Sequence, residues 1–85
     1  MSKKLKAIER LRQNPLNVRF DDLDKLLISL GFEKRNKSGS HFVYTIKTIK
    51  GTYRITVPFR KPFLLPVYVK NALQIIDDLL SDNID

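Results

Sequence analysis

Residues 39–44, Gly-Ser-His-Phe-Val-Tyr, contain the single histidine of this 85-residue chain. Histidine exchanges a proton near neutral pH, which no other residue type in this chain does without a large change in its pKa. His41 follows a stretch of basic and small residues, KRNKSGS, and begins a run that alternates as a β-strand does. It is therefore a candidate general acid or base. The alternative is a surface histidine with no chemical role.

The basic residues around His41 make a phosphate the expected substrate group. RNA carries its own nucleophile, the 2′-hydroxyl, so a protein can cleave it without a metal by moving protons and stabilising charge on the phosphate. One imidazole could perform either proton transfer. Gly39 and Ser40 would let a phosphate approach the main chain closely and offer it N–H donors. The candidate cations are Lys34, Arg35, Lys37, Arg54, Arg60 and Lys61.

The composition favours an anionic partner and excludes several kinds of site. The chain has 16 Lys and Arg against 9 Asp and Glu, a net charge of +7, and a phosphate backbone is the commonest partner of such a protein. The alternative is a charged surface that only keeps the protein soluble. Because there is no cysteine and only one histidine, we expect neither a metal site nor a cofactor.

The chain shows no apolar run near the roughly 20 residues that a membrane helix needs. Its first residues, MSKKLKAIERLRQ, carry charges throughout, unlike a secretory signal. We therefore expect a cytoplasmic protein that makes no contact with a membrane.

Hydrophobic spacing predicts a short amphipathic helix at residues 3–13, which ends at Asn14-Pro15. Such a helix could pack on the body of the protein or form a loosely docked basic arm, and the sequence leaves both open. Its apolar face would consist of Leu5, Ile8 and Leu11.

Two further helices are predicted, at residues 21–30 and 66–80. The first would have Asp21 as its N-cap and Gly31 just after its last turn. The second would begin with Pro66, whose missing N–H is harmless there. Its broad apolar face would comprise Val67, Val69, Ala72, Leu73, Ile75, Ile76, Leu79 and Leu80.

Between these helices the pattern changes to alternation, after an extended segment at 32–36 and a turn at 38–40. A second turn at Gly51 separates the runs 41–49 and 52–57, and a proline-rich loop covers 58–66. The face predicted to be buried carries Phe42, Tyr44, Ile46, Tyr53, Ile55 and Val57. The face predicted to be wet carries His41, Lys47, Arg54 and Thr56.

The expected fold class is α+β. An antiparallel three-stranded sheet would be covered by helices on one face, in the order α-β-β-β-α, with the helix at 3–13 added before it. Residues 1–17 would form an accessory helix and linker, 18–80 the domain, and 81–85 a frayed end.

The order of motifs resembles the HicA toxin family of bacterial toxin–antitoxin modules. The resemblance covers residues 18–80. It rests on DDLDKLLISLGFEKRNKSGSHFVYTI and YRITVPFRKPFLLPVYVKNALQIIDDL, with Gly39-Ser40-His41 opening a strand and a proline-started helix closing the domain. It implies a double-stranded-RNA-binding-domain-like fold and a metal-independent ribonuclease (an mRNA interferase) that blocks translation. It also implies that His41 is catalytic and that a HicB-type antitoxin covers the site.

The leading interpretation is thus an RNA endonuclease with His41 as its proton-transfer residue. The RNA-binding residues would be Lys37, Gly39, Ser40, Arg54, Arg60 and Lys61. One alternative is a non-catalytic RNA-binding module of the same fold, although such modules usually need lysines clustered at the start of the last helix, where this chain offers only Lys70. Another is a basic face that serves only an acidic partner protein.

Overall fold

The computed structural model describes residues 3–83. Within these residues, three helices and three strands follow one another, with a short 3₁₀ turn after the first helix. The elements are α1 (Lys3–Gln13), η1 (Pro15–Asn17), α2 (Phe20–Ser29), β1 (Glu33–Ser38), β2 (His41–Thr48), β3 (Gly51–Pro58) and α3 (Pro66–Asp82).

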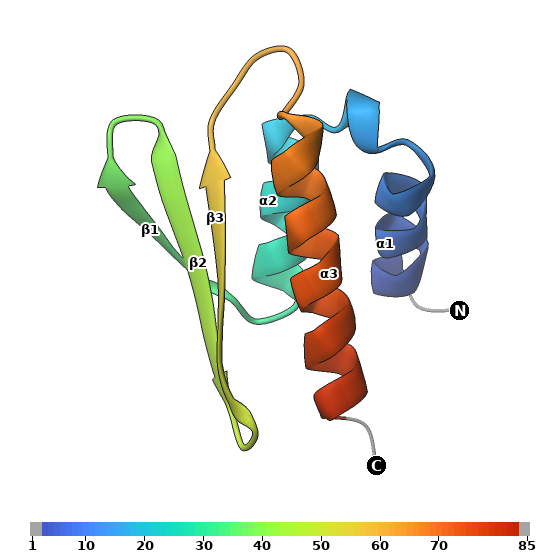
Figure 1. Ribbon diagram of the computed structural model, residues 1–85, viewed down its shortest axis with the longest axis vertical. Coiled ribbons are helices and arrows are strands. Elements are labelled where there is room, and N and C mark those ends of the chain that lie inside the picture. Colours follow the sequence, from blue (N-terminus) through green and yellow to red (C-terminus); the bar gives the residue numbers. More distant parts are fainter. Residues whose placement is uncertain (1–2, 84–85) are drawn as a thin grey trace.

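These elements form layers. The antiparallel sheet has the order β1-β2-β3, and α2 and α3 cover one of its faces while α1 lies on the far side of those helices (Figure 1). No element within residues 3–83 covers the other face of the sheet (Figure 1). The predicted α+β class, with a three-stranded antiparallel sheet and flanking helices, is confirmed.

The predicted alternation in the two longer strands is also confirmed. Tyr44 lies opposite Ile55 and His41 opposite Pro58, so even-numbered residues of β2 face the helices and odd-numbered residues face outward. The inward set is Phe42, Tyr44 and Ile46 on β2 with Tyr53, Ile55 and Val57 on β3, all within or packed against the core. The outward set is His41, Val43, Thr45 and Lys47 with Arg54 and Thr56.

Tyr44 fixes the central strand against α2. Its side chain is 0% exposed, and its hydroxyl donates a hydrogen bond of 2.5 Å to Asp24 Oδ1 on α2. The same carboxylate forms an ion pair with Lys34 Nζ on β1, at 2.9 Å. Burial, together with the bond to Asp24, raises the pKa of Tyr44 well above its usual value, so this hydroxyl stays a donor.

Main-chain bonds end α2 where the sequence places glycine. Gly31 has φ +103, and its N–H donates to the carbonyl of Ile28, while Phe32 N–H donates to the carbonyl of Leu27. These two bonds form a Schellman motif, which needs a left-handed residue at Gly31. Phe32 is then buried in the core, which directs the chain from α2 into β1.

The start of α2 differs from the prediction. Arg19 occupies the N-cap position without a side-chain bond, and Asp21 lies in the first turn. The helix begins earlier because Phe20 is buried and packs its ring on Phe42 and Phe59, which draws its main chain into the first turn. Asp21 remains favourable there, beside the positive end of the helix dipole.

The stretch KRNKSGS continues as a strand further than the extended segment predicted at 32–36. Its first part belongs to β1, which runs to Ser38 and pairs with β2. Every β1 side chain is exposed, so hydrophobic alternation could not reveal this edge strand. Gly51 is the first residue of β3 rather than part of the turn, which consists of Ile49 and Lys50.

The first helix packs on the body of the protein. Ile8 and Leu11 are buried in the same core as α2 and α3, whereas Leu5 is largely exposed. Arg12 donates two hydrogen bonds to the carboxylate of Asp77 on α3, at 2.9 and 2.7 Å. The loosely docked basic arm, one of the two possibilities left by the sequence, is therefore not what the structure has.

The last helix begins at Pro66, as predicted, and extends to Asp82. Val67, predicted to lie on the apolar face, is exposed. The helix includes residues 81–82 of the predicted C-terminal end. Asn83 closes the helix by donating from Nδ2 to the carbonyl of Leu79. Residues 84–85 of the predicted frayed end lie outside the described residues.

Replacing the buried hydroxyl should weaken the fold. We expect Tyr44→Phe to lower the free energy of unfolding by about 1 kcal/mol, because Asp24 loses a donor in a partly buried place. Urea unfolding followed by circular dichroism measures the change. Tyr68→Phe, at a half-buried tyrosine of α3, is the control and should leave the midpoint unchanged. Equal midpoints for Tyr44→Phe and the wild type would contradict the proposed anchoring.

The contact between α1 and α3 should depend on pH. The hydrogen bonds from Arg12 hold the pKa of the Asp77 carboxyl below its usual value. A lowered folded-state pKa means that the ion pair stabilises the protein above the unfolded pKa of about 3.9. That stability is lost as pH falls through the folded value.

A double-mutant cycle of Arg12→Gln and Asp77→Asn should give a coupling of about 0.5–1 kcal/mol at pH 7, typical of an exposed pair. We expect the coupling to shrink toward zero as pH falls below the unfolded pKa of about 4 and through the lowered folded value, as measured by urea unfolding. Asp78→Asn, on the same helix, should show no coupling to Arg12→Gln. A coupling at low pH as large as that at pH 7 would refute the ion pair as its source.

Candidate nucleic-acid interface and active site

His41 is the first residue of β2 and lies exposed on the outward face of the sheet. Its Cα is paired with that of Ser38 on one side and that of Pro58 on the other. It therefore stands at the end of the central strand, at the top of the sheet in Figure 1. No other element within residues 3–83 covers this face, so a ligand has direct access to the imidazole.

A two-residue turn places His41 there. Gly39, at the first turn position, has φ +52, whereas φ is not positive at Ser40, the second position. A type II′ hairpin turn has φ angles of these signs. Asn36 Nδ2 donates to the carbonyl of Gly39 at 3.2 Å and supports the turn. The backbone conformation thus requires glycine at position 39, independently of any role in binding.

A β-bulge lies directly before this turn. The pairing shifts between Asn36 and Ser38, which leaves Lys37 as the extra residue of β1. Bulges re-aim side chains and occur next to functional sites. Lys37, predicted to bind RNA, is therefore close to His41 along the sheet, in an irregular part of the edge strand.

The loop after β3 is attached to the same corner. Phe59 N–H donates to the carbonyl of Ser40 at 2.6 Å. This bond continues the sheet beyond the His41–Pro58 pair and brings the main chains of residues 39–41 and 58–59 together. We call these five residues the His41 corner.

The outward face beside His41 has a dry centre with charged and polar neighbours. Val43 is only 7% exposed although it lies outside the main core cluster. Arg35 and Thr56 are its cross-strand partners. Thr56 is therefore a diagonal neighbour of His41, about 7–8 Å away in a regular sheet, and Arg35 lies on the same face on the other side of the bulge in β1. Side chains on this face thus cover Val43 and form a shallow polar platform.

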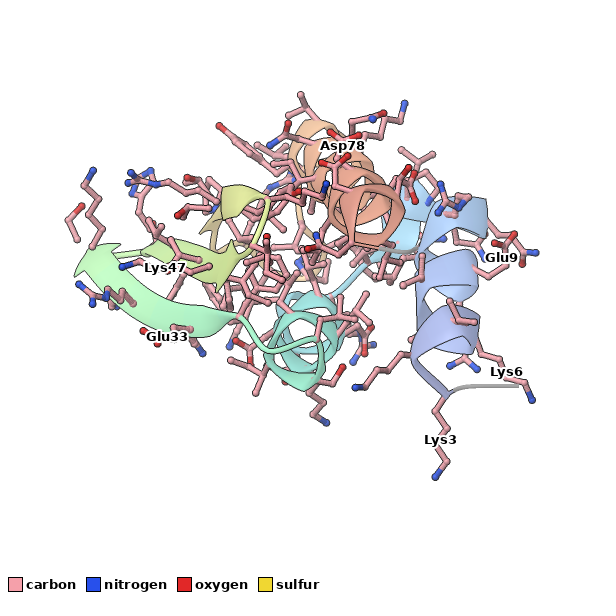
Figure 2. All side chains as sticks on the ribbon, turned by 90° about the horizontal axis from the view of Figure 1, so that it is seen from below. Lys3, Lys6, Glu9, Glu33, Lys47 and Asp78 are labelled. Carbon is pink, nitrogen blue, oxygen red and sulfur yellow. The ribbon has the colours of Figure 1, made fainter. Side chains whose placement is uncertain are left out.

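Arg54 shares this face but not the corner. It is paired with Thr45, which lies four residues along β2 from His41, or about 13 Å at the usual rise per residue. Lys47 lies further along β2, and Glu33, paired with Thr45 on the other side, is an acid on this face. Figure 2 shows Lys47 and Glu33 on the sheet side of the molecule, away from Lys3 and Lys6 of α1.

Arg60 and Lys61 follow the His41 corner on the other side of the sheet's end. Both line a hollow of about 540 Å³ between the loop after β3 and the start of α2. The Lys61 ammonium lies 5.9 Å from the centre of the Phe59 ring. The predicted RNA-binding residues are therefore divided between the outward face and this hollow, with the His41 corner between them.

Among the candidate cations, Lys34 lies away from the candidate site. It lies on the helix-facing side of β1, where it pairs with Asp24. Its ammonium also lies 5.3 and 5.0 Å from the ring centres of Phe20 and Phe42. These contacts indicate a structural role.

Arg35 was a candidate cation in the sequence, but it was not among the RNA-binding residues predicted there. It was one cation among several in KRNKSGS, and a strand of exposed residues gives no hydrophobic signal for its face. Its pairing with Val43 is what places it beside His41. Which residues of β1 share the outward face with His41 could be decided only from the pairing of β1 with β2.

The described residues contain no group of three or more His, Cys, Asp or Glu side chains that could hold a metal ion. None of the helices in residues 3–83 is long and apolar enough to cross a membrane. Compared with protein families, with curated proteins and with solved structures, the chain gives no significant match. Functional inference therefore depends on the geometry and the sequence motifs.

The turn before His41 should be sensitive to a side chain at Gly39. A Cβ there would meet no atom within 4 Å, so Gly39→Ala should destabilise the protein only through its positive φ, by about 1–2 kcal/mol. Urea unfolding measures the loss. Ser40→Ala, at the other turn position, should unfold at the wild-type midpoint. A wild-type midpoint for Gly39→Ala as well would contradict a positive φ at this position.

Proposed function

We propose that the protein is a metal-independent RNA endonuclease in which His41 transfers a proton. The observation that carries this proposal is the position of His41. The only imidazole of the chain is exposed at the end of an uncovered strand, beside a glycine turn, with Arg35 and the bulged Lys37 on the neighbouring strand. A titrating group beside cations on an open surface suits a polyanion that supplies its own nucleophile.

The reaction would use the 2′-hydroxyl of RNA. Loss of its proton lets the 2′-oxygen attack the adjacent phosphorus, the bond from phosphorus to the 5′-oxygen breaks, and that oxygen takes up a proton. The products are a 2′,3′-cyclic phosphate and a 5′-hydroxyl end. His41 would perform one of the two proton transfers, and water would serve the other. One general acid or base contributes about 10²–10⁴-fold, so turnover would be slow.

The cations would have separate roles. Arg35 and Lys37, closest to His41 on the sheet, would stabilise charge on the reacting phosphate. Arg54, about 13 Å along the strand, would contact a flanking phosphate. Gly39 and Ser40 would allow the phosphate to approach the main chain of the turn.

The resemblance to HicA toxins supports a more specific proposal. The protein would be the toxin of a type II toxin–antitoxin module that cleaves mRNA in the cytoplasm and inhibits translation. A HicB-type antitoxin would bind it and cover His41. The order α2-β1-β2-β3-α3 is the order of a double-stranded-RNA-binding domain, which supports assignment to that fold.

A non-catalytic RNA-binding module is the competing function. Lysines at the start of the last helix usually hold phosphates in such modules, and here the first turns of α3 carry only Lys70. This favours the nuclease.

Another alternative is that the basic face binds only an acidic partner protein. The protein would then show no affinity for RNA at low salt, whereas an RNA-binding site predicts affinity that falls steeply with salt.

Cleavage in EDTA tests the proposal. We expect wild-type protein to cut a mixed-sequence single-stranded RNA in EDTA and His41→Ala to cut it at least 100-fold more slowly while still binding it. Lys70→Gln is the matched control and should cleave at close to the wild-type rate. Products are separated on denaturing gels, and their ends are identified by mass spectrometry.

Two outcomes would contradict the proposed nuclease activity. If both proteins bind RNA and neither cuts it, the chain is a binding module. If His41→Ala cuts as fast as the wild type, the reaction does not use this imidazole.

A further inference from the structure

We propose that the hollow beside the His41 corner is a nucleotide subsite, in which Phe59 stacks on a base of single-stranded RNA. The inference rests on the proposed function, since the bound base would be next to the phosphate at His41. The hollow has a volume of about 540 Å³, within the range of small-ligand sites. It is lined by Arg19, Phe20, Asp21, Phe59, Arg60, Lys61 and Pro62.

The Phe59 ring is held in place but remains accessible. The rings of Phe59 and Phe20 pack in a T-shaped arrangement with their centres 5.0 Å apart, and Phe20 in turn packs on Phe42 at the same distance. Phe20 is buried, whereas Phe59 is 37% exposed. A ring that the core holds from one side and solvent reaches from another is a suitable stacking platform.

The charges around this ring suit a nucleotide. Arg19, Arg60 and Lys61 contribute three cations to the lining, against the single carboxylate of Asp21. The ammonium of Lys61 lies over the Phe59 ring, 5.9 Å from its centre. A base stacking on that face would take the place of this ammonium, which would then be free to contact the phosphate of the same nucleotide. Aromatic rings combined with cations that follow the backbone are typical of single-strand binding sites. Asp21 would accept a hydrogen bond from a base N–H.

The main chain links this hollow to the catalytic position. Phe59 directly follows Pro58, the partner of His41, and its N–H is bonded to the carbonyl of Ser40. The contact with Phe20 places Phe59 on the helix-facing side of the sheet's end, whereas His41 lies on the outward side. One RNA strand reaching both must turn over the edge that Ser40 and Phe59 form.

That turn determines the substrate class. A single strand can splay its bases and bend sharply between neighbouring nucleotides, whereas a base-paired A-form helix keeps its bases stacked and paired. The subsite would therefore select single-stranded RNA, in loops or unpaired regions, and exclude duplexes from productive binding.

Tryptophan fluorescence tests the subsite directly, because the chain contains no tryptophan. In a His41→Ala background, a Phe59→Trp variant should be strongly quenched by rU12 through stacking. A Leu65→Trp variant, at an exposed position of the same loop, is the matched control and should keep its emission. A 12-base-pair RNA duplex should quench neither variant.

Affinity provides the second measurement. By fluorescence anisotropy with labelled rU12, Phe59→Ala should bind roughly tenfold more weakly, as expected for loss of one stacked base, with its salt dependence unchanged. Arg60→Gln should reduce the slope of log K against log salt by about 0.7, as expected for one lost phosphate contact. Leu65→Ala should bind as the parent does. Circular dichroism of each variant verifies that the fold is retained.

The proposed subsite is wrong if rU12 binds without quenching the fluorescence of the Phe59→Trp variant and if Phe59→Ala binds rU12 as tightly as the parent does. Wild-type cleavage in EDTA would then still support the nuclease. Quenching and weaker Phe59→Ala binding without any cleavage would instead support the subsite and overturn the enzyme. If UMP binds and quenches as tightly as rU12, the hollow is a site for free nucleotides, and the RNA assignment fails.

Discussion

The buried position of Tyr44 is the constraint on which the rest of the structure depends. Its ring lies in the core, and its hydroxyl is bonded to Asp24, which also holds Lys34. A shift of one residue in β2 would expose this ring and bury its neighbours, because adjacent strand residues point to opposite faces. The anchoring of Tyr44 to α2 therefore also fixes His41, three residues earlier, on the outward face.

This division separates stability from function across the sheet. The helix-facing side holds the aromatic cluster and the Lys34–Asp24 pair, so the cation on that side serves packing. The outward side carries His41 and Arg35 around the dry centre at Val43. A charged group on an open sheet costs little to keep exposed, whereas the same group facing the helices would need a partner, as Lys34 has.

The alternation of β2 and β3 and the glycines at 31 and 39 could be understood from the sequence because each expresses a local rule. Apolar and polar residues alternate where one face is buried, and glycine occurs where φ is positive. β1 could be predicted only as an extended segment, since all its side chains are exposed and its pairing supplies the remaining information. The start of α2 was misplaced because a tertiary contact, Phe20 against Phe42 and Phe59, outweighs the capping preference of Asp21.

The sequence by itself determined the α+β class, the order of the elements and the outward position of His41, since these depend on short-range periodicity and turn chemistry. Only the tertiary structure decided which cations accompany the histidine. Pairing of distant segments placed Arg35 near it and Arg54 farther along, and it brought Phe59 onto Phe20 beside Arg60 and Lys61. Such neighbours are decided by strand register and by the path of a loop, and these follow from the packing of the whole core.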